Sequence, residues 1–197
     1  MDYYFNVTTP PATTPITRDE AKSWMRDIPD ADNLIVDICI AAAVDQGEKY
    51  TNRNFISRTY EGFFSCAEYS RYEIGLYIQV SRNPILSISS FEYMSNGSLV
   101  AVPSDNYELK QVSSGFPRII FSELPNYDAD VVYPFKLTFI SGFGAAADVP
   151  AGIKMALLKH VAFLYENRGD VEPDGGQGMP IEVRADYSNY RITSVCR

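Results

Sequence analysis

The chain has 197 residues, of which 46% are hydrophobic and 21% are charged, and its formal net charge is −8 at pH 7. These are the values of a globular protein with room for one core, and the excess of carboxylates argues against a protein that wraps nucleic acid through its phosphates. The three cysteines, Cys39, Cys66 and Cys196, are odd in number and widely spaced, which argues against a disulfide framework and against a zinc site.

The chain begins with residues 1–15, a polar and aromatic segment that contains the run Thr8-Thr9-Pro10-Pro11. Proline and threonine at this density favour an extended N-terminal arm over a folded element. The segment lacks the basic start and the apolar run of a signal peptide, and no run in the chain reaches the roughly 20 apolar residues of a membrane span. We therefore expect synthesis in the cytoplasm and no membrane contact.

A first helix is predicted over about 17–27. Thr17 is followed three residues later by Glu20, which is the pattern of a capping box, and Pro29 ends the helix.

A second helix is predicted over about 32–52, with Asp30 or Asp32 as its cap. Its small residues Ala41–Ala43 permit the close approach of another backbone.

From about residue 55 to residue 140 the apolar residues recur with a period of two, which is typical of strands. The short candidate strands are rich in Tyr, Phe, Ile and Val, and Asn96-Gly97 between two of them indicates a hairpin. We expect an antiparallel sheet region with strands at 58–64, 75–80, 85–93, 99–102, 107–112, 118–121 and 136–140.

The best specified helix is predicted over about 150–168. Pro150 suits its first turn, Asp148 can cap it, and Gly169 suits its end. The apolar residues cover most of its circumference, which is typical of a helix buried in its own subunit or between subunits. We predict that the helical core and subunit packing use Leu34, Ile38, Ile153, Leu157, Val161 and Leu164.

The glycine-rich stretch after Gly169 predicts a flexible linker, and the tail at 179–197 shows a period of two through Ile181, Val183 and Tyr187. The tail has too little apolar surface to fold alone, so we expect it to add to a partner as a strand or extended segment, and to be removable without unfolding the rest.

The predicted fold is therefore α+β. It is a small helical bundle with an inserted antiparallel β region (about 55–140) and extended arms at both ends. The expected organisation is an N-terminal arm at 1–15, a single domain at 16–168, and a linker with a docking tail at 169–197.

No pattern in the sequence singles out a catalytic, cofactor-binding or metal site. His160 is the only histidine and lies in mid-helix among apolar residues, where a packing role is expected. Gly142-Phe-Gly144 with Ala147 imitates a dinucleotide fingerprint, but the strands before it look antiparallel and Pro150 interrupts the expected helix start. We therefore predict that the protein is not an enzyme and carries no cofactor.

Three separated blocks of residues resemble one protein family. The first runs from Pro15-Ile-Thr17 through Glu20-Ala-Lys22 to Met25-Arg26; the second joins Ala41–Ala43 to Glu48-Lys-Tyr-Thr-Asn-Arg53; and the third joins Phe139-Ile-Ser-Gly-Phe-Gly144 to Val149-Pro150 and Tyr165-Glu-Asn-Arg168. Their order and spacing, over roughly 15–168, resemble the head–tail connector (adaptor) proteins of tailed bacteriophages and gene transfer agents.

This resemblance implies a structural protein of the virion neck. Such adaptors form a ring, usually of twelve copies, below the portal protein, extend the DNA channel, and present a platform for the next neck, stopper or tail protein. The resemblance also implies that the C-terminal segment docks to the portal, through Met179, Ile181, Val183, Tyr187, Tyr190, Arg191 and Ile192. An acidic lumen would let DNA slide through without sequence-specific binding.

Two alternatives remain open at this point. The chain can be a tail-completion protein or another neck component, which differs from an adaptor in its place at the portal–tail joint. From a different class, it can be a small hydrolase or carbohydrate-binding module built on the aromatic sheet region.

Overall fold

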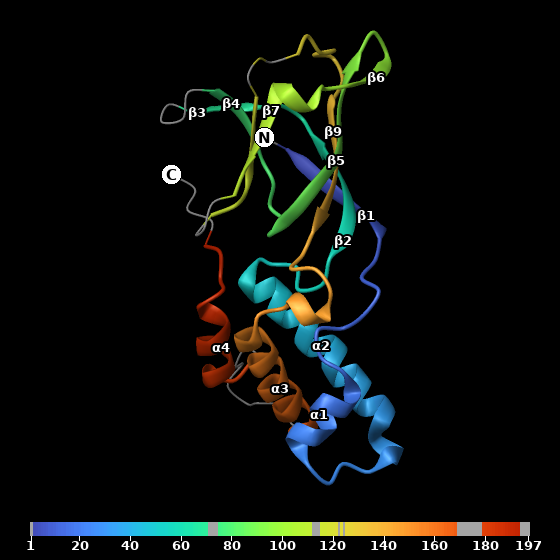
Figure 1. Ribbon diagram of the computed structural model, residues 1–197, viewed down its shortest axis with the longest axis vertical. Coiled ribbons are helices and arrows are strands. Elements are labelled where there is room, and N and C mark those ends of the chain that lie inside the picture. Colours follow the sequence, from blue (N-terminus) through green and yellow to red (C-terminus); the bar gives the residue numbers. More distant parts are fainter. Residues whose placement is uncertain are drawn as a thin grey trace. The chain divides into compact units, whose positions relative to one another are not determined.

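The computed structural model describes residues 2–70, 75–111, 115–121, 123, 125–168 and 179–193. The chain forms two compact units. A sheet unit is built mainly from Met1–Pro11 and Ser57–Phe143, and a helical unit is built from Ala12–Ile56 and Gly144–Ile192. The predicted α+β class is confirmed, and Figure 1 shows the helices and the strands gathered in separate parts of the molecule.

The helices of the described residues are α1 (Arg18–Met25), α2 (Asn33–Thr51), α3 (Ala151–Glu166) and α4 (Ile181–Ser188), with short 3-10 turns at Asp30–Asp32, Ser104–Asn106 and Ala146–Asp148. The first three helices agree with the predicted helices to within about two residues at each end, which is the usual uncertainty of a helix boundary. Helix α4 was not predicted.

One of the expected helix caps forms and the others do not. The Thr17 hydroxyl accepts the Glu20 N–H at 3.1 Å, and the Glu20 carboxylate accepts the Thr17 N–H at 2.6 Å, which completes the capping box of α1. Asp32 stands at the N-cap of α2 but makes no capping hydrogen bond. Asp148 accepts the Ala145 N–H at 2.8 Å, so it closes the turn before α3 and does not cap the helix itself.

The sheet unit contains two antiparallel sheets. The five-stranded sheet has the order β1-β2-β9-β5-β6, with β1 (Tyr3–Thr9), β2 (Arg58–Phe64), β9 (Phe135–Ser141), β5 (Ile85–Ser95) and β6 (Ser98–Ala101). The four-stranded sheet has the order β3-β4-β8-β7, with β3 (Glu68–Ser70), β4 (Gly75–Gln79), β8 (Arg118–Phe121) and β7 (Tyr107–Lys110). All seven predicted strands are present.

The prediction that residues 1–15 form an extended arm and not a folded element is wrong for their first part, because Tyr3–Thr9 forms strand β1 of the sheet. The strand pairs with β2 in an antiparallel register that places Tyr3 opposite Phe64 and Val7 opposite Tyr60. Phe5 packs its ring against Tyr60 and Phe64. The alternation of Tyr3, Phe5 and Val7 supplies the apolar side chains of a strand, and the prolines that suggested an arm come only after it.

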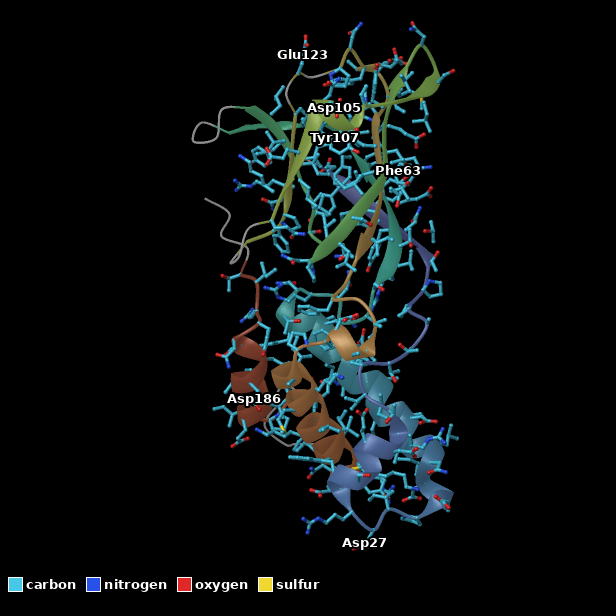
Figure 2. The ribbon with its side chains drawn as sticks, in the orientation of Figure 1. Asp27, Phe63, Asp105, Tyr107, Glu123 and Asp186 are labelled. Carbon is cyan, nitrogen blue, oxygen red and sulfur yellow. The ribbon has the colours of Figure 1, made fainter. Side chains whose placement is uncertain are left out.

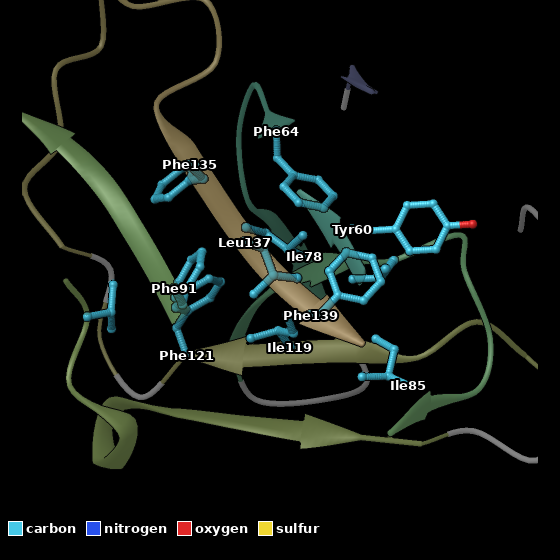
Figure 3. Close-up of a cluster of buried hydrophobic side chains, with 12 residues drawn as sticks. Tyr60, Phe64, Ile78, Ile85, Phe91, Ile119, Phe121, Phe135, Leu137 and Phe139 are labelled. Carbon is cyan, nitrogen blue, oxygen red and sulfur yellow. The ribbon is translucent and has the colours of Figure 1, made fainter. Parts of the chain in front are cut away.

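The core of the sheet unit lies between the two sheets (Figure 3). The central strand β9 contributes Phe135, Leu137 and Phe139, which are fully buried. Both sheets supply the cluster, which consists of Tyr60, Phe64, Ile78, Val80, Ile85, Phe91, Val102, Ile119, Phe121, Phe135, Leu137 and Phe139.

The helical unit has its own core around α3, which contacts α1, α2 and α4. Its fully or nearly buried apolar residues come from each of the helices and from the segments beside them, and they are Ile16, Ala21, Val36, Cys39, Ile40, Ala43, Phe55, Ile56, Val149, Ile153, Ala156, Leu157, Val161, Val183, Tyr187 and Ile192. The core therefore includes residues of the tail that the sequence placed outside the domain.

Replacing Thr17 by Ala removes the hydroxyl that accepts the Glu20 N–H. We expect the helical unit to lose about 1 kcal/mol of stability, the usual contribution of an N-cap side chain. Urea unfolding followed by far-UV circular dichroism measures this loss. Thr13→Ala, at an exposed position before the helix, is the control and should change stability by less than about 0.5 kcal/mol. Equal stability of the two variants would contradict the role given to the cap.

Candidate functional site

The described side chains form exposed surfaces and hydrogen bonds that hold the helices together. No group of three or more His, Cys, Asp or Glu in the described ranges is arranged to hold a metal ion. His160 is fully buried on α3, with its ring 6.2 Å from that of Tyr187. A substrate in solution cannot reach it, so His160 is a packing residue. No helix of the described residues is long and apolar enough to cross a membrane.

The segment predicted to dock to a partner as a strand forms helix α4, so that prediction of its secondary structure is wrong. Val183, Tyr187 and Ile192 are buried in the helical unit. Of the other residues assigned to docking, Ile181 is 74% exposed, Arg191 is exposed, and Met179 and Tyr190 are half-buried. The segment therefore has an inner face that belongs to the core and an outer face that is free to meet a partner.

Hydrogen bonds hold the end of the segment to the end of α2. The Ile192 N–H donates to the Thr51 carbonyl at 2.9 Å, and the Asn52 side-chain amide donates to the Ile192 carbonyl at 2.8 Å. The Arg53 guanidinium donates to the Tyr190 carbonyl at 2.6 Å, and its burial lowers the pKa of Arg53. These bonds satisfy backbone groups after α4, where the chain has no helical partners for them.

Among the residues that the structure describes, Tyr187 is the largest fully buried side chain. Its ring stacks on that of Phe55 with 6.2 Å between centroids. Gly47 on α2 makes room for it, because a Cβ atom at position 47 would lie 3.0 Å from the tyrosine ring and 3.0 Å from its hydroxyl. Burial raises the pKa of the Tyr187 hydroxyl, which has no hydrogen-bond partner among the described residues.

On the outside of the segment, Lys159 of α3 and Asp186 of α4 form an ion pair at 2.7 Å; Asp186 is labelled in Figure 2. The Arg191 guanidinium lies 4.7 Å from the centre of the Tyr50 ring. Together with the buried residues, these contacts make the segment part of the helical unit. The expectation that residues 179–197 can be removed without unfolding the rest conflicts with the burial of Val183, Tyr187 and Ile192, whose loss would uncover the core.

Some of the residues that carried the family resemblance form braces, which here means hydrogen bonds that hold helix ends to other segments of the chain. Asp32, before α2, accepts hydrogen bonds from the Tyr165 hydroxyl and from the Arg168 guanidinium, the latter at 3.3 Å. Arg168 also lies 4.5 Å from the centre of the Tyr165 ring. These hydrogen bonds lower the pKa of Asp32 and raise that of Tyr165. The start of α2 is thereby fixed to the end of α3.

A second brace closes the other end of α2. The Glu48 carboxylate accepts the Phe55 N–H at 2.7 Å, and Asn52 ends the helix with a left-handed backbone (φ 55°, ψ 35°). The motif from Glu48 to Arg53 thus turns the chain after α2 and binds the C-terminal segment. Its residues shape the fold through these hydrogen bonds.

The outer face of α2 is apolar although it faces away from the core. The core face of this helix is formed by residues such as Val36, Ile40 and Ala43. At 3.6 residues per turn, Leu34 and Ile38 project on the opposite side, and they are 69% and 60% exposed. Leu34 and Ile38 therefore do not belong to the core of this chain. The other role predicted for them, packing between subunits, remains a proposal.

The outer face of α3 also carries apolar side chains. Ile153, Leu157 and Val161 are fully buried on its inner side, while Leu164 is half-buried. On the opposite side Met155 is 41% exposed, and Leu158 and Ala162 are half-buried. A helix that is apolar on two sides indicates a second contact beyond its own core.

The sheet unit exposes a small group of aromatic rings. Tyr4 stacks on Phe63 with centroids 4.7 Å apart, and Tyr133 meets Tyr4 edge-on at 5.0 Å. The Lys136 ammonium lies 6.0 Å from the centre of the Phe63 ring and pairs with Glu61 at 2.7 Å. Phe63 is labelled in Figure 2.

Sequence reasoning missed the helical nature of the tail and the outward direction of Leu34 and Ile38. One signal for the helix was present: Pro180 stands where an N-terminal proline suits a helix start, and the buried Val183 and Tyr187 are four residues apart. The direction of Leu34 and Ile38 had no such signal, because both sides of α2 carry apolar residues.

Of the three comparisons with known proteins, only the one with solved structures found similar chains. No family model matches the sequence, and no curated protein matches it. Among solved structures, a chain in the neck of an empty gene transfer agent (GTA) particle, computed with C6 symmetry, is similar with a TM-score of 0.77 and 20% identity. The similarity covers 98% of this chain and 97% of that chain.

Two further structures are similar over nearly their whole length. A chain in the virion of a native GTA particle gives a TM-score of 0.71 at 21% identity, over 97% of this chain and 96% of that one. A chain in the neck of a native GTA particle, computed with C12 symmetry, gives 0.68 at 20% identity, over 98% and 97%. This chain therefore has the fold of those chains from end to end.

Replacing Tyr187 by Ala should cost the helical unit about 3–5 kcal/mol, because it empties the largest buried position of the core. Urea unfolding measures the loss. Ile181→Ala on the same helix is the matched control, since its side chain is 74% exposed, and it should cost less than about 0.5 kcal/mol. Similar costs for the two variants would show that α4 is not packed against the bundle.

The buried Tyr187 hydroxyl also predicts a dependence of stability on alkaline pH. The pKa of this hydroxyl is raised in the folded protein above its ordinary value of about 10. Above about pH 10 the unfolded chain loses this proton while the folded chain keeps it, so stability falls as the pH rises. We expect unfolding free energies to fall more steeply above pH 10 in the wild type than in Tyr187→Phe. Parallel pH profiles would contradict the burial of the hydroxyl.

Proposed function

We propose that this protein is a structural component of the neck of a tailed bacteriophage or gene transfer agent particle, an adaptor between the portal protein and the next neck, stopper or tail protein. The observation that carries the proposal is the similarity to a chain in the neck of an empty GTA particle, which covers 98% of this chain at a TM-score of 0.77. Both units and the C-terminal segment are included in a match of that extent.

The adaptor acts as a ring. The necks that contain the similar chains were computed with C6 and C12 symmetry, so a ring of twelve copies is compatible with both. In such a ring each copy meets one neighbour through one surface and the other neighbour through a different surface, and every copy uses the same pair of surfaces.

DNA passes through the ring without being held. The formal charge of −8 per copy favours weak contact with phosphates, because phosphate binding depends on lysine and arginine side chains that displace counterions. An acidic lumen keeps the passage of DNA loose. The work of such a protein is contact with other proteins, which requires neither a cofactor nor a catalytic residue.

The C-terminal segment faces the portal protein. Its exposed residues Ile181 and Arg191, with the half-buried Met179 and Tyr190, form the contact. Val183, Tyr187 and Ile192, which the resemblance also assigned to docking, hold the segment in place from inside. Their burial supports a segment presented by the bundle as a preformed surface, which lowers the entropy lost on binding.

A tail-completion protein or another neck component is the alternative within the same class, and only the place of the chain at the joint separates it from an adaptor. The alternative of a hydrolase or carbohydrate-binding module has less support, since it does not explain the similarity to chains in the necks of GTA particles.

The proposal is tested by removing the gene and examining the particles. We expect DNA-filled heads and separate tails, with joining restored by the wild-type gene. Electron microscopy of purified complete particles should place the chain in the neck, next to the portal. Particles that lack the chain, or heads and tails that join without it, would overturn the proposal.

A further inference from the structure

We propose that neighbouring copies of this chain pack head to tail through their helical units, the outer face of α2 in one copy lying against the outer face of α3 in the next. The α2 face is defined by Leu34, Ile38 and Ala41, and the α3 face by Met155, Leu158 and Ala162. The inference rests on the proposed ring, and it names the surfaces that form it.

The two faces point away from each other within one helical unit. Helices α2 and α3 contact each other and direct their buried residues, such as Ile40 and Leu157, into the shared core. Each outer face lies about opposite the inner face of its own helix. The unit therefore presents one apolar face on each of two opposite sides.

Met155 on the α3 face, and Leu34 and Ile38 on the α2 face, stay exposed although other helices pack beside them. Helix α4 lies along one flank of α3, where Lys159 meets Asp186. The end of α3 is tied on its other flank by Tyr165, which donates to Asp32. Between these flanks Met155 remains 41% exposed. On α2 the apolar face ends at the ion pair of Asp45 and Lys49.

Leaving this apolar area in contact with water is unfavourable in free energy unless another surface covers it. Leu34 and Ile38 are among the most exposed large apolar side chains of the described residues, at 69% and 60%. They lie on adjacent turns of one helix. Contiguous apolar surface of this kind marks an interaction site. Ala41, also exposed, adds no bulk, so the backbone of a partner helix can approach closely beside it.

The partner that fits is a second copy of this chain. Two different faces on opposite sides of one unit make a heterologous contact, and repeated heterologous contacts close into a ring when the rotation between copies allows it. The necks of similar chains were computed with C6 and C12 symmetry, and closed rings of this symmetry need such a contact.

The two chain segments that carry the faces differ in net charge. The stretch from Arg18 to Asn52, which contains α1 and α2, has eight acidic and four basic side chains. Helix α3 has Lys154 and Lys159 beside its outer face, and its one acidic residue is Glu166 at the end. This difference favours a contact between α2 of one copy and α3 of the next. A contact between two copies of α2 would bring like charges together.

The test is chemical cross-linking of cysteine variants. The background is the full chain with Cys66→Ser and Cys196→Ser, which leaves Cys39 in the buried core. Ile38→Cys and Met155→Cys are introduced singly and together in cells that assemble particles, and a short, permeable bismaleimide is added. The chain is then detected on denaturing gels, and the presence of each variant in purified particles is measured separately.

A head-to-tail contact predicts a ladder of covalent oligomers for the double variant, since each copy then carries one reactive thiol on each face. Each single variant should give little dimer, because position 38 meets position 155 and not a second position 38. Ser23→Cys with Asp105→Cys, two other exposed positions, is the matched control and should give no ladder.

The outcomes separate this inference from the proposed function. A ladder, whether or not the chain is found in particles, supports the contact. Dimers from either single variant would show a two-fold contact and overturn it. A chain that is present in particles but gives no ladder, or links to a different protein through position 38, would overturn the contact and leave the neck function standing.

Discussion

The burial of one side of α3 is the interaction on which the helical unit depends. Residues Ile153, Leu157 and Val161 on that side are fully buried, and α1, α2 and α4 all contact this helix. Helices α1 and α4 have only eight residues each, and helices shorter than about 12–15 residues are marginal alone in water. They exist because α3 offers them a surface, and the braces at Asp32 and Arg53 hold the ends of that arrangement.

The sequence predicts the parts of this fold whose signals are local. Thr17 and Glu20 form the predicted capping box, and the period-two segments around Asn96-Gly97 form the predicted strands. It does not predict which of two apolar faces turns inward. Leu34 and Val36 are both apolar, and only the packing of α2 on α3 decides that Val36 is buried and Leu34 exposed. Side chains on both faces therefore look like core residues until the partner helix is known.

The secondary structure of short segments is harder still to predict, because the periods of a strand and of a helix can both fit the same residues. Ile181, Val183 and Tyr187 satisfy a period of two, but Val183 and Tyr187 also stand one helical turn apart, and the pocket made by Gly47 and Phe55 favours the helix. The family resemblance had a different limit. Its motif residues Glu48, Arg53 and Arg168 hold segments of this chain together, so these residues identify a way of folding.

The order of the elements along the chain sets the order in which the two units can form during synthesis. The sheet unit draws mainly on residues up to Phe143, whereas the helical unit needs Ile192, close to the C-terminus, to complete its core. Since domains fold as units while the chain emerges from the ribosome, the strands can be in place when α3 and α4 have not yet left the exit tunnel. A nascent chain therefore completes its helical bundle only after Ile192 has left the tunnel, so contacts that need the finished bundle form only after that point.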